Sequence, residues 1–408
     1  MQYNSTSRGG TRYRGGNQRN RSGGGGNRRR APQKGRGNQG QYIHPDKFVN
    51  KMPVADQPVF TATHSFSDFG LFPALEQTLQ KRGYSSPTAI QDEAILPAMD
   101  GQDVIGIANT GTGKTAAFVL PIIHRLKTGQ ADGQVLIIAP TRELAGQIDE
   151  EFRSFSQGLN LYSVVCVGGM RIDPQIRALQ RRPQVVIGTP GRLKDLLQQR
   201  KLHLDSTGIL VLDEADRMLD MGFLPDIRFL LDRLPTKRQS LCFSATITPT
   251  IKDLMDRMMN DPVSVSVRTG DTSRQVAQDI VRTTSKEHKL EVLTNLLAQP
   301  HFEKVLVFGQ TKFGVQRLAD TLSQQGTPAQ AIHGNKTQSQ RQRALKAFKD
   351  GHVDILVATD VAARGLDIPN VSHVINFDQP HTYDDYIHRI GRTGRAGKRG
   401  EALTFISQ

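Results

Sequence analysis

Residues 104–123 constrain the fold more than any other part of this sequence. An apolar run at 104–107 leads into Ala108-Asn109-Thr110-Gly111-Thr112-Gly113-Lys114-Thr115, and a second apolar stretch follows at 116–123. This order is typical of a buried strand, a glycine-rich loop and a helix. The first N–H groups of such a helix, together with its dipole, form a ready site for phosphate. The segment therefore predicts an α/β fold with a phosphate-binding loop.

The loop residues have separate expected roles. Gly111 and Gly113, with Thr110 and Thr112 beside them, let backbone N–H groups close around phosphate oxygens. Lys114 is expected to reach the terminal phosphates, and Thr115 is expected to offer its hydroxyl to Mg²⁺. Ala108 stands where the strict pattern has glycine. On this motif alone, a chance glycine-rich loop remains an alternative.

A second motif supplies carboxylates further along the chain. Asp213-Glu214-Ala215-Asp216 follows an apolar run at 209–212, which is typical of a buried parallel strand whose carboxyl end faces a ligand. Asp213 is placed to hold Mg²⁺, and Glu214 to orient or deprotonate an attacking water. Alone, this tetrad is also compatible with a solvated acidic turn. With the glycine-rich loop before it, it predicts an ATP hydrolysis site.

Composition excludes several other classes of protein. The only cysteines, Cys166 and Cys242, lie in predicted strands, and no Cys/His cluster has metal-ligand spacing, so a disulfide framework and a zinc site are both excluded. No apolar run approaches the length of a membrane span. We expect a soluble intracellular monomer, cytoplasmic by default, with a nuclear location left open.

The basic charge is concentrated at the N-terminus. Residues 1–40 carry nine Arg, one Lys and no acidic residue, so they account for +10 of the net charge of +14. This Gly-, Arg- and Asn-rich tail is predicted to be disordered because it has too little apolar surface to fold. Arg and Tyr side chains contact phosphates and stack on bases, so the tail is expected to bind RNA without reading sequence. A solubilising linker, or a tail that binds protein, is the alternative.

The rest of the chain reads as two similar α/β domains. A connector is expected at 41–63, a first domain at 64–268, a linker at 269–278 and a second domain at 279–408. Only the first domain has the Gly-Lys-Thr loop, so one nucleotide site is expected. Strands are predicted at 135–139, 164–167, 185–188, 209–212 and 241–244, and in the second domain at 305–308, 329–332, 355–358, 374–377 and 402–406.

A cluster of cations lies near the end of the second domain. His388-Arg389-Ile390-Gly391-Arg392-Thr393-Gly394-Arg395 places arginines three residues apart. If the two domains face each other, Arg392 and Arg395 are candidates for arginine fingers that stabilise charge on the γ-phosphate. A basic surface patch is the alternative.

In order and spacing, these motifs resemble the DEAD-box RNA helicases, superfamily 2 ATPases with two RecA-like domains, over residues 64–408. The resemblance includes the family's Q motif at Gly83-Tyr84 and Pro87-Thr88-Ala89-Ile90-Gln91. It implies that Gln91 reads adenine, that Tyr84 packs on the base, and that Phe66 is the isolated upstream aromatic. ATP rather than GTP is therefore the implied nucleotide.

The resemblance also implies residues for RNA binding and for coupling. It assigns Ser244-Ala245-Thr246 to the link between hydrolysis and strand separation, with His388 as its partner, and Gly365 and Asp367 to nucleotide contacts. The sequence stops soon after 406, so the family's last helix is expected to be missing. The implied contacts to the RNA backbone are Pro140, Thr141, Arg142, Gly169, Thr189, Pro190, Gly191, Arg192, Gln338, Arg341, Thr359 and Asp360.

The sequence therefore predicts an RNA-stimulated ATPase that locally unwinds short RNA duplexes or remodels RNA–protein complexes, with ATP and Mg²⁺ as cofactors. Two rivals remain. A DNA helicase or translocase shares the phosphate chemistry, although Gln91 and the tetrad at 213–216 argue against it. An RNA-binding or annealing protein would use ATP only to clamp, with the tail supplying most of the affinity.

Overall fold

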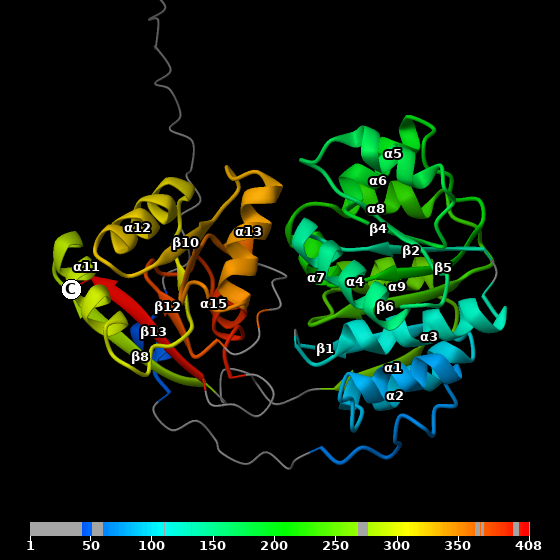
Figure 1. Cartoon of the computed structure of the whole chain (residues 1–408), viewed down its shortest axis with the longest axis horizontal. Helices are drawn as coiled ribbons and strands as arrows, with labels where there is room; N and C mark the ends of the chain where they lie inside the picture. Colours follow the sequence, from blue (N-terminus) through cyan, green and yellow to red (C-terminus); the bar gives the residue numbers. More distant parts are fainter. Residues whose placement is uncertain are drawn as a thin grey trace, which may run out of the picture. The chain divides into compact units, whose positions relative to one another are not determined.

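The computed structural model describes residues 43–50, 60–109, 111–131, 133–267, 276–363, 368, 371–394 and 400–407. Five parts of the predictions lie outside the described residues: the tail at 1–40, Thr110, Gly365, Asp367 and Arg395. Within the described residues, the secondary structure forms two separate parallel sheets, each flanked by helices (Figure 1). None of the helices in these ranges is both long and apolar enough to cross a membrane.

The first sheet is parallel throughout and has the strand order β3-β4-β2-β5-β6-β1-β7. Because all its strands run the same way, their carboxyl ends meet at one edge. The strands are β1 (Val104–Ala108), β2 (Gln134–Ile138), β3 (Ser163–Cys166), β4 (Val185–Gly188), β5 (Thr207–Leu212), β6 (Gln239–Ser244) and β7 (Val263–Val267).

Helices cover both faces of this sheet because its strands are apolar on both sides. In β2, Val135 and Ile137 enter one hydrophobic cluster, whereas Leu136 and Ile138 enter another. The helices of the domain are α1 (Pro73–Lys81), α2 (Ala89–Met99), α3 (Lys114–Thr128), α4 (Arg142–Phe155), α5 (Ile172–Leu179), α6 (Pro190–Gln198), α7 (Ala215–Asp220), α8 (Leu224–Leu231) and α9 (Pro249–Met258).

The second sheet has the order β10-β11-β9-β12-β13-β8 and is also parallel. Its strands are β8 (Val276–Thr283), β9 (Val305–Phe308), β10 (Ala329–Ile332), β11 (Ile355–Ala358), β12 (His373–Asn376) and β13 (Gly400–Ser407). The helices are α11 (Lys286–Leu297), α12 (Lys312–Gln324), α13 (Gln338–Lys349), α14 (Asp360–Ala363) and α15 (Tyr383–Ile390). The predicted fold, two tandem RecA-like domains, is confirmed.

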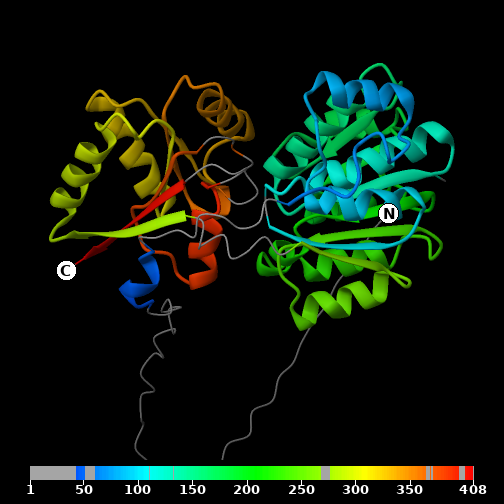
Figure 2. The ribbon, with the colours of Figure 1, turned by 90° about the horizontal axis from the view of Figure 1, so that it is seen from below.

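A short segment that precedes the first domain packs on the second. The 3₁₀ helix η1 (Pro45–Phe48) buries Phe48, which is 1% exposed, with its ring centroid 4.7 Å from that of Tyr386. Figure 2 shows η1, in blue, next to the second domain. Asn50 then pairs with Gln278 of β8 through two backbone hydrogen bonds of 2.8 and 3.0 Å. The predicted connector at 41–63 is therefore partly an element of the second domain.

Two of the strands in the described part of the chain were not predicted, and both lie at sheet edges. β7 alternates valine and serine, and β8 includes Gln278, Asp279 and Arg282. An edge strand is partly solvated, so it lacks the continuous apolar run that marks a central strand. β8 begins at Val276, inside the stretch predicted as a linker at 269–278 and three residues before the predicted domain boundary at 279.

Candidate functional site

The predicted motif loops of the first domain follow the carboxyl ends of its parallel strands. The glycine-rich loop follows β1, the tetrad at 213–216 follows β5, and the segment at 244–246 begins at the last residue of β6. Thr141 and Arg142 follow β2, Gly169 follows β3, and residues 189–192 follow β4. The sheet therefore brings segments that are far apart in the chain to one edge.

The glycine-rich loop has the backbone that its sequence requires. Gly111 and Gly113 have φ values of 86° and 92°, a region that a side chain disfavours. Lys114 begins α3, and its Nζ donates a 2.9 Å hydrogen bond to the carbonyl of Ala108 at the end of β1. Thr112 Oγ1 donates to the carbonyl of Asn109 at 2.8 Å. Lys114 is 6% exposed, so its ammonium group is held inside the loop.

Gln91 connects the glycine-rich loop to the first turn of α2. Its Oε1 accepts a hydrogen bond from the backbone N–H of Thr88 at 3.0 Å, which completes a capping box. Its Nε2 donates to the carbonyl of Gly113 at 3.1 Å. A side-chain amide has two hydrogens and two acceptor lone pairs, so one of each remains. This is the pair needed to hydrogen-bond an adenine edge.

A pocket of about 260 Å³ opens beside these residues. Tyr84 lines it, and Phe66 packs edge-on against Tyr84, with the ring centroids 5.8 Å apart. The pocket brings together the predicted residues Tyr84, Gln91, Gly111, Gly113, Lys114, Thr115, Asp213 and Glu214. Its lining also includes residues that were not predicted, namely Ala116, Leu144, Gln147, Glu150, Glu151 and Lys349.

The two carboxylates after β5 lie deep in this pocket. Asp213 is 2% exposed, and burial raises its pKa to about 7, with Glu214 and Asp216 adding to the rise and Lys114 opposing it. Glu214 has a φ of 52°, a strained backbone conformation for a residue with a side chain. A cation would relieve the repulsion among these carboxylates. Asp213 and the Thr115 hydroxyl are hard oxygen donors, which fits Mg²⁺.

Asp216 is bound to the segment at the end of β6. Its Oδ2 accepts hydrogen bonds from the backbone N–H groups of Ala245 and Thr246, both at 3.0 Å, and from Thr246 Oγ1 at 3.2 Å. Ser244 Oγ accepts a 3.3 Å bond from the Asp216 N–H and donates a 2.7 Å bond to the carbonyl of Thr246. The tetrad and the predicted coupling segment therefore form one hydrogen-bonded unit.

A second pocket, of about 370 Å³, adjoins this unit. Asp216 and Thr246 line it together with His388 and Arg392 from the last helix of the second domain and the turn after it. His388, which the family resemblance predicts to be the partner of the segment at 244–246, lines the same pocket as Thr246. Arg392 is 3% exposed, and its Nε donates to the carbonyl of His388 at 3.3 Å.

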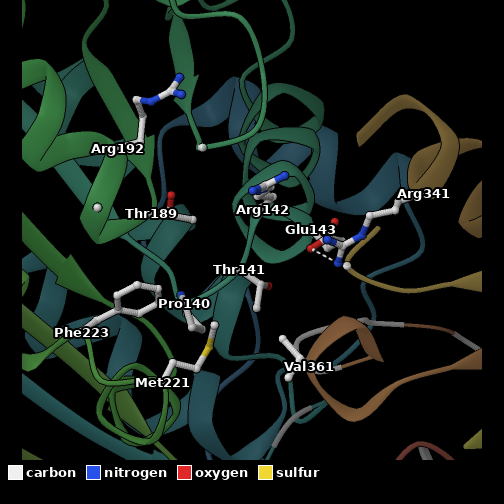
Figure 3. A pocket seen from close by; sticks show the side chains of 13 residues that line it. Pro140, Thr141, Arg142, Glu143, Thr189, Arg192, Met221, Phe223, Arg341 and Val361 are labelled. Atoms are coloured by element: carbon white, nitrogen blue, oxygen red, sulfur yellow. Dashed lines mark ion pairs between the residues drawn. The ribbon is translucent and has the colours of Figure 1, made fainter. Parts of the chain in front are cut away.

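A third pocket, of about 470 Å³, gathers residues predicted to bind RNA (Figure 3). It is lined by Pro140, Thr141, Arg142, Glu143, Gly168, Thr189, Gly191, Arg192, Met221, Phe223, Gly334, Arg341 and Val361. Gly169 has a φ of +71° and lies directly against Arg142. A Cβ at this position would fall 1.9 Å from the Arg142 guanidinium, so the close approach requires glycine. Arg192 donates to the Met170 carbonyl at 3.3 Å through both terminal nitrogens. Met221 and Phe223 were not predicted, since they follow α7 without a recognisable motif.

Glu143 is a further residue that the sequence did not single out for binding. Its carboxylate pairs with Arg341 at 3.0 Å, drawn as dashes in Figure 3, and accepts a 3.1 Å hydrogen bond from Gln338 Nε2. Both partners were predicted to contact RNA. Burial lowers the pKa of Arg341, and Glu143 opposes that shift. Among the described residues, Gln338 Oε1 and Arg341 Nε have no hydrogen-bond partner.

Asp360, also predicted to contact RNA, has a strong internal partner. Arg389 Nε and Nη2 donate to its two carboxylate oxygens at 2.5 and 2.8 Å. Arg389 is 1% exposed and also bonds the side chain of Asn376 at 3.2 Å. The Asp360 carboxylate thus ties α14 to α15. Thr359, beside it, is partly exposed at the end of β11.

The fold and these pockets define a class of protein: a two-domain α/β protein that has a P-loop pocket and a separate basic pocket. Residues 88–254 match the model of the DEAD/DEAH box helicase family, and residues 288–397 match the helicase conserved C-terminal domain. The chain is 46% identical over 84% of its length to ATP-dependent RNA helicase CshA of Listeria monocytogenes and 44% identical over 85% to DEAD-box ATP-dependent RNA helicase CshA of Bacillus subtilis. It therefore belongs to the DEAD-box ATP-dependent RNA helicases. It spans 66% and 70% of the length of those two relatives.

Solved structures agree with this assignment. The structure of S. cerevisiae Dbp5 bound to RNA and ADP BeF3 is similar with a TM-score of 0.73 and 31% identity, over 84% of this chain and 90% of that one. Mss116p bound to ssRNA and AMP-PNP also gives a TM-score of 0.73, with 29% identity, over 84% of this chain and 74% of that one. The predicted family is confirmed.

Proposed function

We propose that this chain is an RNA-stimulated ATPase that locally separates short RNA duplexes or remodels RNA–protein complexes. The observation that carries the proposal is the shared edge of the first sheet. The loops after β1 and β5 line the pocket of Lys114, Asp213 and Glu214. The loops after β2, β3 and β4 line the basic pocket of Arg142 and Arg192. A ligand in either pocket thus contacts loops that follow strands of the same sheet.

ATP is the nucleotide that the first pocket fits best. Gln91 retains one donor and one acceptor for adenine, and Lys114 lies where the phosphates would be bound. Thr115 and Asp213 would hold Mg²⁺, which supplies charge neutralisation on the phosphates when bound. Glu214 then orients the attacking water. Arg392, with Arg395, is proposed to stabilise the charge that develops on the γ-phosphate.

RNA is the ligand that the basic pocket fits best. Thr141 and Thr189 offer hydroxyls, Arg142 and Arg192 offer guanidinium groups, and glycines allow close approach of a backbone. Such groups recognise phosphate and sugar oxygens and do not read base sequence. Phe223 adds an aromatic ring that can stack on a base. Gln338, Arg341 and Thr359 are proposed to extend these contacts from the second domain.

The network around Asp216 supports coupling between the two ligands. It joins the carboxylates after β5 to the segment at 244–246, and this segment lines a pocket with His388. If ATP and RNA each bind better to the same arrangement of the domains, each must increase the affinity for the other. We infer that hydrolysis is slow until RNA is bound.

The test is the rate of ATP hydrolysis by the full chain with and without single-stranded RNA. We expect RNA to raise kcat at least tenfold, and Glu214→Gln to lower it by about 10²-fold or more while ATP still binds. Glu93→Gln, an exposed carboxylate change on α2, is the matched control and should leave the rate unchanged. A rate that ignores RNA, or a Glu214→Gln variant as fast as the parent, contradicts the proposal. Equal stimulation by DNA would favour a DNA helicase.

A further inference from the structure

A buried carboxylate lies next to Gln91 on α2. Asp92 is 5% exposed and faces the segment before α1, whereas Gln91 faces the glycine-rich loop. Its Oδ2 accepts a 2.7 Å hydrogen bond from the backbone N–H of Thr63. Its Oδ1 lies 3.1 Å from the backbone nitrogen of His64 and 2.7 Å from Nδ1 of the same residue. One side chain therefore holds two successive backbone groups and an imidazole.

These bonds keep the carboxylate charged. Burial alone raises the pKa of Asp92, but the hydrogen bonds from Thr63 and His64 outweigh that effect and hold the pKa below its usual value. Hydrogen bonds to an ionised acceptor are about twice as strong as those between neutral groups. The attachment of residues 63 and 64 to α2 is thus a strong local constraint.

The segment that Asp92 holds carries Phe66. Two residues after His64, the ring of Phe66 packs against Phe69 at 5.9 Å and against Tyr84 at 5.8 Å, both edge-on. The His64 ring also lies 5.9 Å from Phe69. Tyr84 in turn lines the nucleotide pocket and packs on Phe155 at 5.6 Å. A continuous series of contacts runs from Asp92 to the aromatic end of that pocket.

We propose that Asp92 is a positioning residue for nucleotide recognition: its carboxylate fixes residues 63 and 64 so that Phe66 supports Tyr84 at the base-binding end of the pocket. This inference rests on the proposed use of that pocket for ATP. The first turn of α2 then contributes to nucleotide binding in two ways: Gln91 supplies hydrogen bonds to the base, and Asp92 fixes the position of Phe66, which supports Tyr84. Loss of Asp92 should weaken base binding without affecting the chemistry at Glu214.

The experiment compares Asp92→Ala with Phe66→Ala in the full chain, measuring the Kd of MgATP by calorimetry, and KM and kcat at saturating RNA. Phe66 acts on the base only through Tyr84, so we expect Phe66→Ala to raise Kd and KM roughly tenfold. Asp92→Ala should raise them about three- to tenfold, with kcat within about twofold of the parent. The double variant should be no weaker than Phe66→Ala, since both changes act through one contact. Asp92→Asn, which keeps an acceptor, should be intermediate.

Asp103→Ala is the matched control. Asp103 is also buried, at 7% exposure, and accepts backbone hydrogen bonds from Ser240 at 2.6 Å and Asn260 at 2.7 Å, but it precedes β1, at the opposite edge of the same sheet. The Asp103→Ala variant should lower the unfolding temperature as Asp92→Ala does, and it should leave the Kd of MgATP unchanged. Additive effects of Asp92→Ala and Phe66→Ala, or a Kd for Asp92→Ala equal to that of the parent, overturn the inference. A parent chain that does not bind MgATP would instead overturn the proposed function.

Discussion

Several residues of the nucleotide pocket serve the fold as well as the ligand. Gln91 caps α2 and bonds the glycine-rich loop, and Lys114 is held by the strand that precedes it. Glu214 keeps a left-handed backbone conformation, which persists only where the surroundings enforce it. Such pre-set geometry means that little reorganisation remains when a ligand arrives.

Asp216 is the residue whose loss should impair strand separation while leaving ATP binding nearly unchanged. Asp216→Ala leaves the N–H groups of Ala245 and Thr246 and the Thr246 hydroxyl without their acceptor. Each of these donors that stays buried lowers the stability of the folded state by about 1–3 kcal/mol. We expect the duplex-unwinding rate to fall at least tenfold, while the Kd of MgATP changes by less than about threefold, because Asp216 does not line the pocket that holds Lys114.

The measurement is gel-based unwinding of a short RNA duplex beside calorimetric ATP binding. Asp226→Ala, which removes a carboxylate paired with Lys194 at 2.7 Å in the same domain, is the control and should alter neither quantity. Equal losses of unwinding and ATP affinity in Asp216→Ala would mean that Asp216 serves the nucleotide directly.

At the scale of elements, η1 is expected to stabilise the second domain. Phe48 is buried against Tyr386, Val276 and their neighbours, so Phe48→Ala should lower the free energy of unfolding of that domain by about 3 kcal/mol. Urea unfolding of the full chain, followed by a probe in the second domain, measures this. Phe313→Ala, at a ring that is 72% exposed on α12, is the control and should change it by less than about 0.5 kcal/mol. Equal effects of the two variants would show that η1 does not support the domain.

The start of β12 makes the second domain sensitive to acid. His373 stacks on Phe302 with centroids 4.0 Å apart, near His301 and Glu401, and burial lowers its pKa although Glu401 opposes the shift. The unfolded chain therefore takes up a proton near pH 6.5 that the folded chain takes up only at lower pH. The free energy of unfolding should therefore fall as the pH drops below about 6.5. His373 contributes at most about 1.4 kcal/mol per pH unit to this fall.

Urea unfolding at pH 7.5, 6.5 and 5.5 tests this. His373→Gln removes the titrating group and should flatten the dependence on pH. His124 and His333, whose pKa values burial also lowers, leave a residual slope in the same direction. A slope that is unchanged in His373→Gln would assign the effect to those two residues.

The sequence predicts well those elements whose structure is determined by residues close together in the chain. β1, the glycine-rich loop and the tetrad after β5 follow from apolar runs and from glycine and charge patterns within a few residues. The contact of Glu143 with Gln338 joins residues 195 positions apart, and no local pattern marks it. The same holds for Phe223, Phe48 and Asp92, because the role of each depends on contacts with residues that are distant in the sequence. Edge strands β7 and β8 were missed because solvent on one side permits polar residues.

At the scale of the whole molecule, residues 1–40 should contribute affinity for RNA and leave the chemistry unchanged. Deleting them removes ten cations, and each lost phosphate contact should reduce the slope of log affinity against log salt by about 0.7 for a single strand. We expect weaker and less salt-dependent RNA binding, with kcat at saturating RNA within about twofold of the parent. Fluorescence anisotropy across a salt series measures this.

Replacing the nine arginines of that segment with lysine is the matched variant, because it keeps the charge and removes the planar guanidinium groups. It should restore the salt slope and only part of the affinity. If deletion abolishes RNA binding and ATP then makes no difference, the protein is an RNA-binding protein whose main site is the tail.

The packing of η1 on the second domain also bears on how the two domains move. The chain passes from one domain to the other twice, between Asn50 and Phe60 and again between Val267 and Val276. A single crossing would tether the two domains at one point only, whereas two crossings tether them at two points and so restrict their relative motion more.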